Sequence, residues 1–532
     1  MNRRLLGSIS ASPIIAVGLV LAVGLVFSGC LSPLPPPAQD PMIGRSTPDV
    51  GTGTVAGADS SPGGRKLAGW RALGVNPITW TPPLISDFAD TLRPGVVVFW
   101  VEDSSLPFAS VRMAWPEGRL ALPSQADADA SLLGELLLRG GTSRFTPAQL
   151  EDTLEFLAAG VSVSVGMVRT TANVSGLTRD LPFLLDVLGD AIVSPRLDTA
   201  RVTIAKSERI QDIEHRFDTP AQALSLSWDR VANGPGPWTE LVDSQEVRKV
   251  NVHSLKSALT GRFSTRKMWI AVAGSFDRKQ TRQQLSGFLD RLDSSAYQGK
   301  TPAKLDSLPP LPAMIAPGVV ICDKPGNQSQ IRLGLRFLRR DHPDYYPLML
   351  ASEVLGQGGF GSRLVDRVRS DEGLAYHVSS FVGSDYDRPA TIGVTLQTKV
   401  QSTSRALVLV REEIKRLADS GFRAGELGKA RKGMIASIPS LFDSPEGTAD
   451  LLLQSAAWGR SNQHFVRYLR ALDTIPDSTV LRVFRKWFVP DSMRVVISGP
   501  AKELQAPFAD GSPALSSWGP VRVWTEDTLR RR

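Results

Sequence analysis

Cysteine and histidine are scarce in this chain, and both shortages limit its chemistry. Among 532 residues there are two cysteines, Cys30 and Cys322, and five histidines. Two cysteines exclude a disulfide-stapled scaffold. No two histidines stand four residues apart, so the sequence lacks the pair that binds zinc from one face of a helix.

A strong charge of either sign is also missing. Lys and Arg number 61 and Asp and Glu 53, which gives a formal net charge of +8 at pH 7. Because this excess is small for the length of the chain, we expect no nucleic-acid partner. The 42% of apolar and 21% of charged residues are ordinary for a globular protein and exclude wholesale disorder.

The N-terminal segment has the pattern of an export signal. An uncharged apolar run at 14–27 follows Arg3 and Arg4 and precedes Ser28, Gly29 and Cys30. It is shorter than the roughly 20 residues of a membrane-spanning helix, and the pattern predicts a secretory signal over residues 1–29. Its end resembles the lipobox of bacterial lipoproteins. That resemblance implies a lipid on Cys30 and a place in the cell envelope, at the outer membrane facing the periplasm.

An ordinary signal peptide, or an uncleaved anchor with an incidental cysteine, is the alternative for this segment. Residues 30–68 are rich in Pro, Gly and Ser and lack a periodic apolar pattern. We therefore predict that they form the lipid anchor and a flexible linker.

The remainder of the chain repeats itself. The string PGVVVF recurs as PGVVIC, and FSTRKMWIAVAG recurs as FVPDSMRVVISG. The pattern of Glu135, Gly140-Gly141 and Ser143-Arg144 also recurs. The three offsets lie between 218 and 225 residues. Three landmarks in the same order indicate a duplication.

The repeat predicts the domain organisation and the fold class. We expect domains at 69–295 and 313–510, a linker at 296–312 and a tail at 511–532. Clusters of strand-like runs alternate with helical stretches in each half. This alternation predicts the α+β class, with a mixed sheet and helices packed on one face.

The second half carries the residues of a family resemblance. Together with the duplication, three strings of this half resemble the insulinase (pitrilysin) family of inverted zinc metallopeptidases, and the resemblance covers residues 86–505. The strings are QSQIRLGL, DYYPLMLASEVLGQGGFGSRL and VRSDEGLAYHVSS. The resemblance implies duplicated domains that form a clam-shell around a peptide. The catalytic motif of that family is H-x-x-E-H, in which two histidines bind zinc and the glutamate polarises a zinc-bound water.

The zinc motif is degenerate in this chain. In the matching string LLGELLLRGGT, Glu135 holds the place of the glutamate, but Leu132 and Leu136 replace both histidines. Leucine has no lone pair for a metal, so we expect no zinc site, and Glu135 to be a remnant or a structural hydrogen-bonding group. The third family ligand aligns with Asp212, which is not expected to hold a metal alone. A non-standard metal site at Asp212, Glu214 and His215 is one alternative, and an exposed charged helix face is the other.

Residues that the family uses to hold its substrate are retained. Arg369 and Tyr376 match the family's Arg–Tyr pair, which implies contact with the peptide backbone and the developing oxyanion. Gly358 and Gly359 match a glycine-rich loop implicated in substrate recognition. The alternatives are a surface ion pair for Arg369, sheet packing for Tyr376 and a helix-ending turn for the glycines.

Three functional hypotheses follow from these residues. The first is a non-catalytic subunit that binds peptide, holds no cofactor of its own and partners a zinc-bearing homologue in envelope proteolysis. The second is a peptide-binding or scaffold lipoprotein with no peptidase role. The third is an active metallopeptidase that uses the non-standard metal site.

Overall fold

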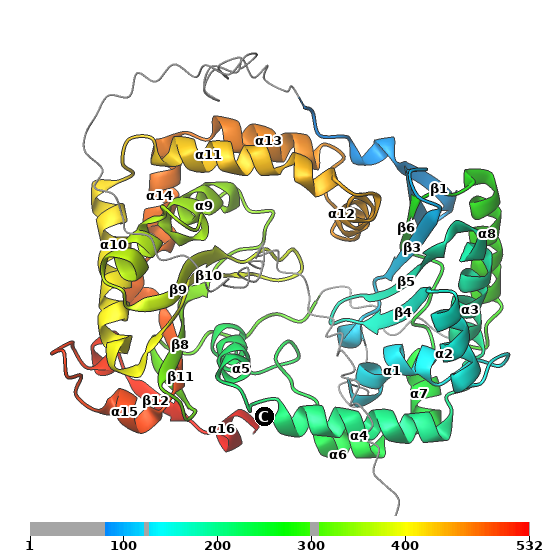
Figure 1. Ribbon diagram of the computed structural model, residues 1–532, viewed down its shortest axis with the longest axis horizontal. Coiled ribbons are helices and arrows are strands. Elements are labelled where there is room, and N and C mark those ends of the chain that lie inside the picture. Colours follow the sequence, from blue (N-terminus) through cyan, green and yellow to red (C-terminus); the bar gives the residue numbers. More distant parts are fainter. Residues whose placement is uncertain (1–79, 122–126, 298–307, 531–532) are drawn as a thin grey trace, which may run out of the picture. The chain divides into compact units, whose positions relative to one another are not determined.

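The computed structural model describes residues 80–121, 127–297 and 308–530 (Figure 1). The expected signal peptide, Cys30 and the linker that follows it lie outside these residues, as does most of the expected interdomain linker. Within the described ranges, no helix is both long enough and apolar enough to cross a bilayer.

Two six-stranded sheets form the framework of the molecule. The strands of the first sheet are, in spatial order, β1 (Ala89–Arg93), β2 (Val96–Glu102), β6 (Met268–Gly274), β3 (Phe108–Trp115), β5 (Thr170–Leu177) and β4 (Gly160–Val165). Only β2 and β6 pair in parallel, and the other neighbours are antiparallel. The sheet is therefore mixed, as the sequence predicted.

The second sheet repeats the order of the first. Its strands are, in spatial order, β12 (Val521–Trp524), β7 (Gly318–Asp323), β11 (Arg494–Gly499), β8 (Gln328–Arg336), β10 (Thr391–Lys399) and β9 (Ala375–Val382). Strands β7 to β11 follow the pattern of β2 to β6, which confirms the duplication. The outermost strand differs, because β12 comes from the segment expected to be a tail and pairs in parallel with β7. That segment belongs to the sheet of the second half.

Each sheet packs one face against helices of its own half. In the first half these are α1 (Asp127–Arg139), α2 (Pro147–Phe156), α3 (Leu181–Val193), α4 (Thr199–His215), α6 (Ser244–Lys249), α7 (Val252–Leu259) and α8 (Arg278–Asp293). In the second half they are α9 (Tyr345–Ser352), α10 (Thr403–Ser420), α11 (Glu426–Ser437), α13 (His464–Thr474), α14 (Asp477–Trp487) and α15 (Ala501–Gln505), and the short α16 (Glu526–Arg530) follows β12. One large apolar cluster fills each layer.

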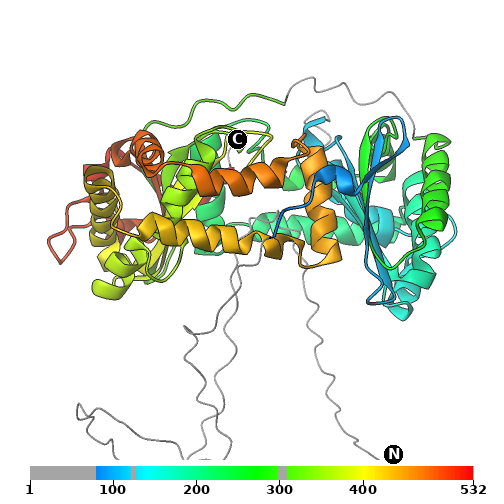
Figure 2. The same ribbon diagram turned by 90° about the horizontal axis from the view of Figure 1, so that it is seen from above.

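The opposite face of each sheet is covered by a helix from the other half. Helix α5 (Pro220–Asn233) packs on the second sheet, and α12 (Pro445–Ala457) packs on the first (Figures 1 and 2). The two helices occupy equivalent places in the repeat, because their first residues, Pro220 and Pro445, are 225 residues apart, within the offsets of the repeated strings. Each helix also starts with proline after a Thr or Ser N-cap. The halves thus exchange one helix reciprocally.

The expectation of helices on one face only is therefore wrong. Side chains show the reason: Trp228 of α5 packs with Val320 and Val496, and Leu452 of α12 packs with Phe99. Every residue of β6 is buried. A strand that is buried on both sides reads as a continuous apolar run, and such a run requires cover on both faces of its sheet.

The two sheets also meet at the ends of their outer hairpins. Arg169, between β4 and β5, donates two hydrogen bonds to the carboxylate of Asp387, between β9 and β10, at 2.6 and 2.8 Å. Trp458 Nε1 donates to the same carboxylate at 3.2 Å. The Arg169 and Asp387 side chains are only 20% and 17% exposed. This bidentate pair joins the two halves at a second place, apart from the exchanged helices.

Removal of this pair should weaken the cohesion of the two halves. Asp387→Asn leaves the Arg169 guanidinium half-paired in a largely buried place, so we expect a loss of about 2 kcal/mol in unfolding free energy, less than for a fully buried pair. The measurement is urea unfolding of the full chain. Asp341→Asn serves as control, because the Arg339–Asp341 pair is about half exposed and should change stability by less than about 0.5 kcal/mol. Equal effects of the two substitutions would show that the Arg169–Asp387 pair does not hold the halves together.

Candidate functional site

Helix α1 carries the positions that correspond to the zinc motif. Leu132 and Leu136 are 1% and 0% exposed and belong to the apolar cluster of the first half, beside Leu133 and Leu137. The four leucines fill the helix face that packs on the sheet. The histidine positions of the motif are therefore part of a hydrophobic core.

Glu135 points away from that core and is held by an arginine one turn later. Arg139 donates to the carboxylates of both Glu135 and Glu208, the latter at 2.7 and 3.3 Å. The hydrogen bond to the Glu208 carboxylate raises the pKa of Arg139 above its usual value; burial opposes this shift and Glu135 adds to it. The hydrogen bond from Arg139 lowers the pKa of Glu208. A permanent cation thus occupies the lone pairs of Glu135, which fits a structural role. The sequence does not indicate that Glu208 takes part in this contact. It indicates only that Arg139, four residues after Glu135, can pair with Glu135 on the same face of a helix.

Asp212 does not join Glu135. Its side chain is 61% exposed on α4, and its carboxylate lies 4.0 Å from Arg209 of the same helix. His215 Nδ1 and Asp218 Oδ2 lie 2.7 Å apart on a similarly exposed surface. Among the residues that the structure describes, no three His, Cys, Asp or Glu side chains gather as metal ligands.

Arg369 and Tyr376 lie close to the outer edge of the second sheet. Arg369 belongs to a π-helical segment, Val365–Asp371, and its guanidinium is 5.0 Å from the ring centroid of Phe360. Tyr376 belongs to β9, the edge strand, and is 79% exposed. Phe360 is 76% exposed. An exposed aromatic and cationic surface therefore borders β9, which pairs only with β10 among the strands of the described residues.

A bulge in β9 sets the direction of Tyr376. Gln397 of β10 pairs with His377, but the next residue, Thr398, pairs with Ala375, so Tyr376 has no partner across the ladder. A bulge breaks the alternation of side chains along a strand. Tyr376 and His377 are consequently both exposed, whereas successive side chains of a regular strand point to opposite faces. Partial burial, followed by the charge of Arg369, lowers the pKa of His377.

The glycine-rich turn positions Phe360. Gly359 has φ +66°, a conformation that side chains rarely adopt, and a Cβ on Gly358 would lie 2.7 Å from the carbonyl oxygen of Glu353. Both glycines are thus needed for the turn, and the turn presents an exposed phenylalanine. We call Phe360, Arg369, Tyr376 and His377 the Arg–Tyr surface. Phe360 and His377 lie within the quoted family strings, but the sequence assigns neither of them a role.

Comparisons with known proteins agree with this geometry. A family model described as the peptidase M16 inactive domain matches residues 249–434. The non-peptidase homolog YmxG of Helicobacter pylori is 25% identical over 360 residues, which cover 65% of this chain and 78% of that protein. The probable mitochondrial-processing peptidase subunit beta of Arabidopsis thaliana is 22% identical over 432 residues, 78% of each chain.

A solved structure shows the same fold. The peptidase M16 inactive domain from Pseudomonas fluorescens matches with a TM-score of 0.68 at 20% identity, over 78% of this chain and 97% of that one. The duplicated mixed sheets, the degenerate motif helix and these matches lead to one conclusion. The chain is similar to members of the peptidase M16 (insulinase) family and has the α+β fold of a solved M16 inactive domain.

Proposed function

We propose that this chain is a non-catalytic M16 subunit that binds peptide and pairs with a zinc-bearing homologue. The contrast between its two halves carries the proposal. In the first half the zinc-ligand positions are core leucines, whereas in the second half the Arg–Tyr surface is exposed at a sheet edge. The described part of the chain keeps groups that can hold a peptide, and it has leucines where the family's zinc ligands stand.

The edge strand supports peptide binding. The free side of β9 presents backbone groups that an extended peptide can pair with, and such strand addition is a general mode of peptide recognition. Arg369 and Tyr376 add a permanent cation with several donors and a neutral hydroxyl donor beside that edge. Phe360 adds apolar contact area for a peptide side chain.

The names of two relatives support a division of labour. One is a non-peptidase homologue, and another is one subunit of a processing peptidase. In the proposed complex the two chains form a clam-shell, and the Arg–Tyr surface faces the zinc motif of the partner. The pattern of residues 1–30 supports attachment through a lipid on Cys30, at the outer membrane facing the periplasm.

The zinc content of the purified chain tests the first part of the proposal. Elemental mass spectrometry of the full chain should find less than about a tenth of an equivalent, because leucine offers no ligand and Asp212 faces solvent. Close to one equivalent, lost on His215→Ala, would instead favour the hypothesis of a non-standard metallopeptidase.

A mixing assay tests the second part. The chain alone should not cleave an unfolded peptide pool, whereas cleavage should appear, or rise, when a zinc-bearing M16 homologue from the same source is added. The control is the homologue alone at the same concentration. Peptide binding without any gain in cleavage would favour the scaffold hypothesis.

A further inference from the structure

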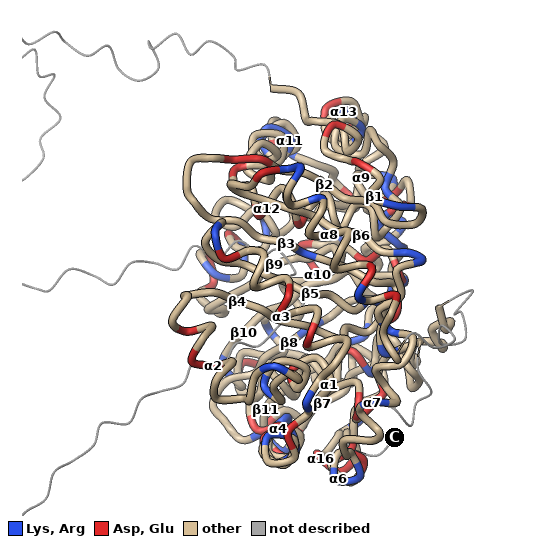
Figure 3. Tube along the Cα trace, turned by 90° about the vertical axis from the view of Figure 1, so that its right-hand side faces the viewer, with Lys and Arg blue, Asp and Glu red and all other residues tan. Residues whose placement is uncertain are grey.

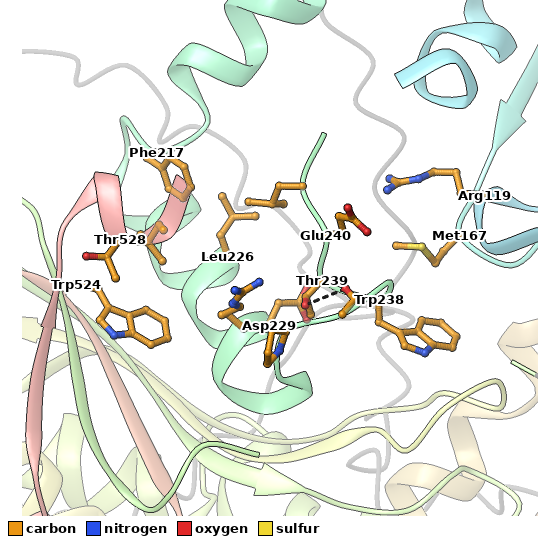
Figure 4. A pocket seen from close by; sticks show the side chains of 15 residues that line it. Arg119, Met167, Phe217, Leu226, Asp229, Trp238, Thr239, Glu240, Trp524 and Thr528 are labelled. Atoms are coloured by element: carbon orange, nitrogen blue, oxygen red, sulfur yellow. Dashed lines mark hydrogen bonds between the residues drawn. The ribbon is translucent and has the colours of Figure 1, made fainter. Parts of the chain in front are cut away.

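A cavity of about 550 Å³ lies away from the Arg–Tyr surface, where α5 passes between the two halves (Figure 4). One wall comes from Phe217 and Leu226, and another comes from Trp524 on β12. Trp238, in the loop after α5, stands on the opposite side from Trp524 in Figure 4. The volume and the aromatic lining are typical of sites that take a small molecule or one end of a peptide.

The wall that carries Trp238 is fixed in place. Its indole Nε1 donates to the carbonyl oxygen of Pro309 at 2.7 Å, and the guanidinium of Arg388 lies 5.1 Å from its ring centroid. At the start of this loop the backbone of Gly234, whose φ is +70°, packs closely against Ala313, because a Cβ on Gly234 would lie 3.0 Å from the Ala313 carbonyl oxygen. Because the wall is built before any ligand arrives, binding requires little ordering of the protein.

The charges that line the cavity are not all compensated. Asp229 accepts a hydrogen bond from Asn233 at 3.0 Å, and Arg388 and Arg332 partly offset the burial that raises the pKa of Asp229. Arg119 contacts Asp127 at 3.4 Å, and Glu240 has a partner of its own. Arg230 differs: in the described part of the chain its side chain has no hydrogen bond, ion pair or ring contact.

We infer that this cavity binds a monoanionic ligand with an apolar body, whose carboxylate pairs with Arg230 and whose body lies between Trp238 and Trp524. A guanidinium binds a carboxylate through two parallel hydrogen bonds, so the ligand end is specified by geometry as well as by charge. Two sources offer this chemistry, namely the free C-terminus of a peptide with a bulky last residue and a fatty acid.

Isothermal titration calorimetry on the full chain, with matched probes, tests the inference. The probes are Ala-Ala-Ala-Phe as free acid and as amide, and decanoate with decanol. For at least one pair the acid should bind about tenfold more tightly than its uncharged counterpart, as expected for a charge-assisted contact. Arg230→Gln should abolish that preference. Arg470→Gln, which changes an exposed arginine on α13, should retain it.

Further variants keep the outcome unambiguous. Because the Arg230 side chain has no partner in the described part of the chain, Arg230→Gln should keep the unfolding midpoint of the parent. Leu226→Trp should fill the cavity and remove the preference for each acid over its uncharged counterpart. This preference, rather than total peptide binding, is the readout that separates the cavity from the Arg–Tyr surface. A preference for the peptide acid identifies a peptide end as the source, and a preference for decanoate identifies a fatty acid. Equal binding of acids and neutral probes, a preference that survives Arg230→Gln, or no binding at all would overturn the inference.

Discussion

Restoring the histidines of the zinc motif, by Leu132→His with Leu136→His, should destabilise the first half and should not create a zinc site. Both side chains are almost fully buried in an apolar cluster, where an imidazole has no hydrogen-bond partner. Burial of unsatisfied polar groups costs about 1–3 kcal/mol each, so we expect a loss of at least about 3 kcal/mol in unfolding free energy. Zinc is not expected to offset this loss, because Asp212 is exposed and paired with Arg209, while Glu135 is held by Arg139.

Chemical unfolding with and without added zinc measures this effect. Leu106→His is the matched control, because Leu106 is 68% exposed and its replacement should change stability by less than about 0.5 kcal/mol. A triple variant that adds Arg139→Ala frees the Glu135 carboxylate. Zinc binding by the triple variant but not by the double variant would show that the Arg139 guanidinium excludes the metal. If the double variant bound one equivalent of zinc at unchanged stability, the description of α1 as a packed core helix would be wrong.

In the proposed mixed complex, Arg369→Ala should lower the rate of peptide cleavage about a hundredfold. A preorganised donor aimed at a developing oxyanion contributes about 3–4 kcal/mol to the transition state, and less when it acts on the substrate backbone alone. Assembly should be unaffected, because Arg369 is exposed and lies over the exposed ring of Phe360. The effect should therefore fall on kcat more than on KM.

The measurement is steady-state cleavage by the purified complex, with assembly checked by size-exclusion chromatography. Tyr376→Phe, which removes only the hydroxyl, should reduce the rate by a smaller factor, and Arg470→Ala should leave it unchanged. Normal turnover by an assembled complex with Arg369→Ala would remove this residue from the proposed role and would favour a scaffold.

The distribution of surface charge is compatible with peptide binding but does not distinguish peptide binding from other roles. Figure 3 shows Lys and Arg interspersed with Asp and Glu along the described elements, as the small net charge indicated. Specificity must therefore come from local groups such as the Arg–Tyr surface rather than from a long-range field.

Local patterns determined much of this protein by themselves. The repeated strings predicted two copies of one α+β unit, and the sheet orders repeat accordingly. Leu132 and Leu136 predicted the loss of metal ligands, because the identity of a side chain at a motif position decides whether it can bind a metal. Such inferences need only sequence spacing and side-chain chemistry.

Tertiary structure decided everything that depends on contacts between distant segments. The exchange of α5 and α12, the pairing of Arg139 with Glu208 and the contact of Arg169 with Asp387 join residues far apart in the chain. The bulge that exposes Tyr376 depends on the register between β9 and β10, which no local pattern fixes. Helix and strand periodicity says which face of an element is buried, but the packing of the whole chain decides what buries it.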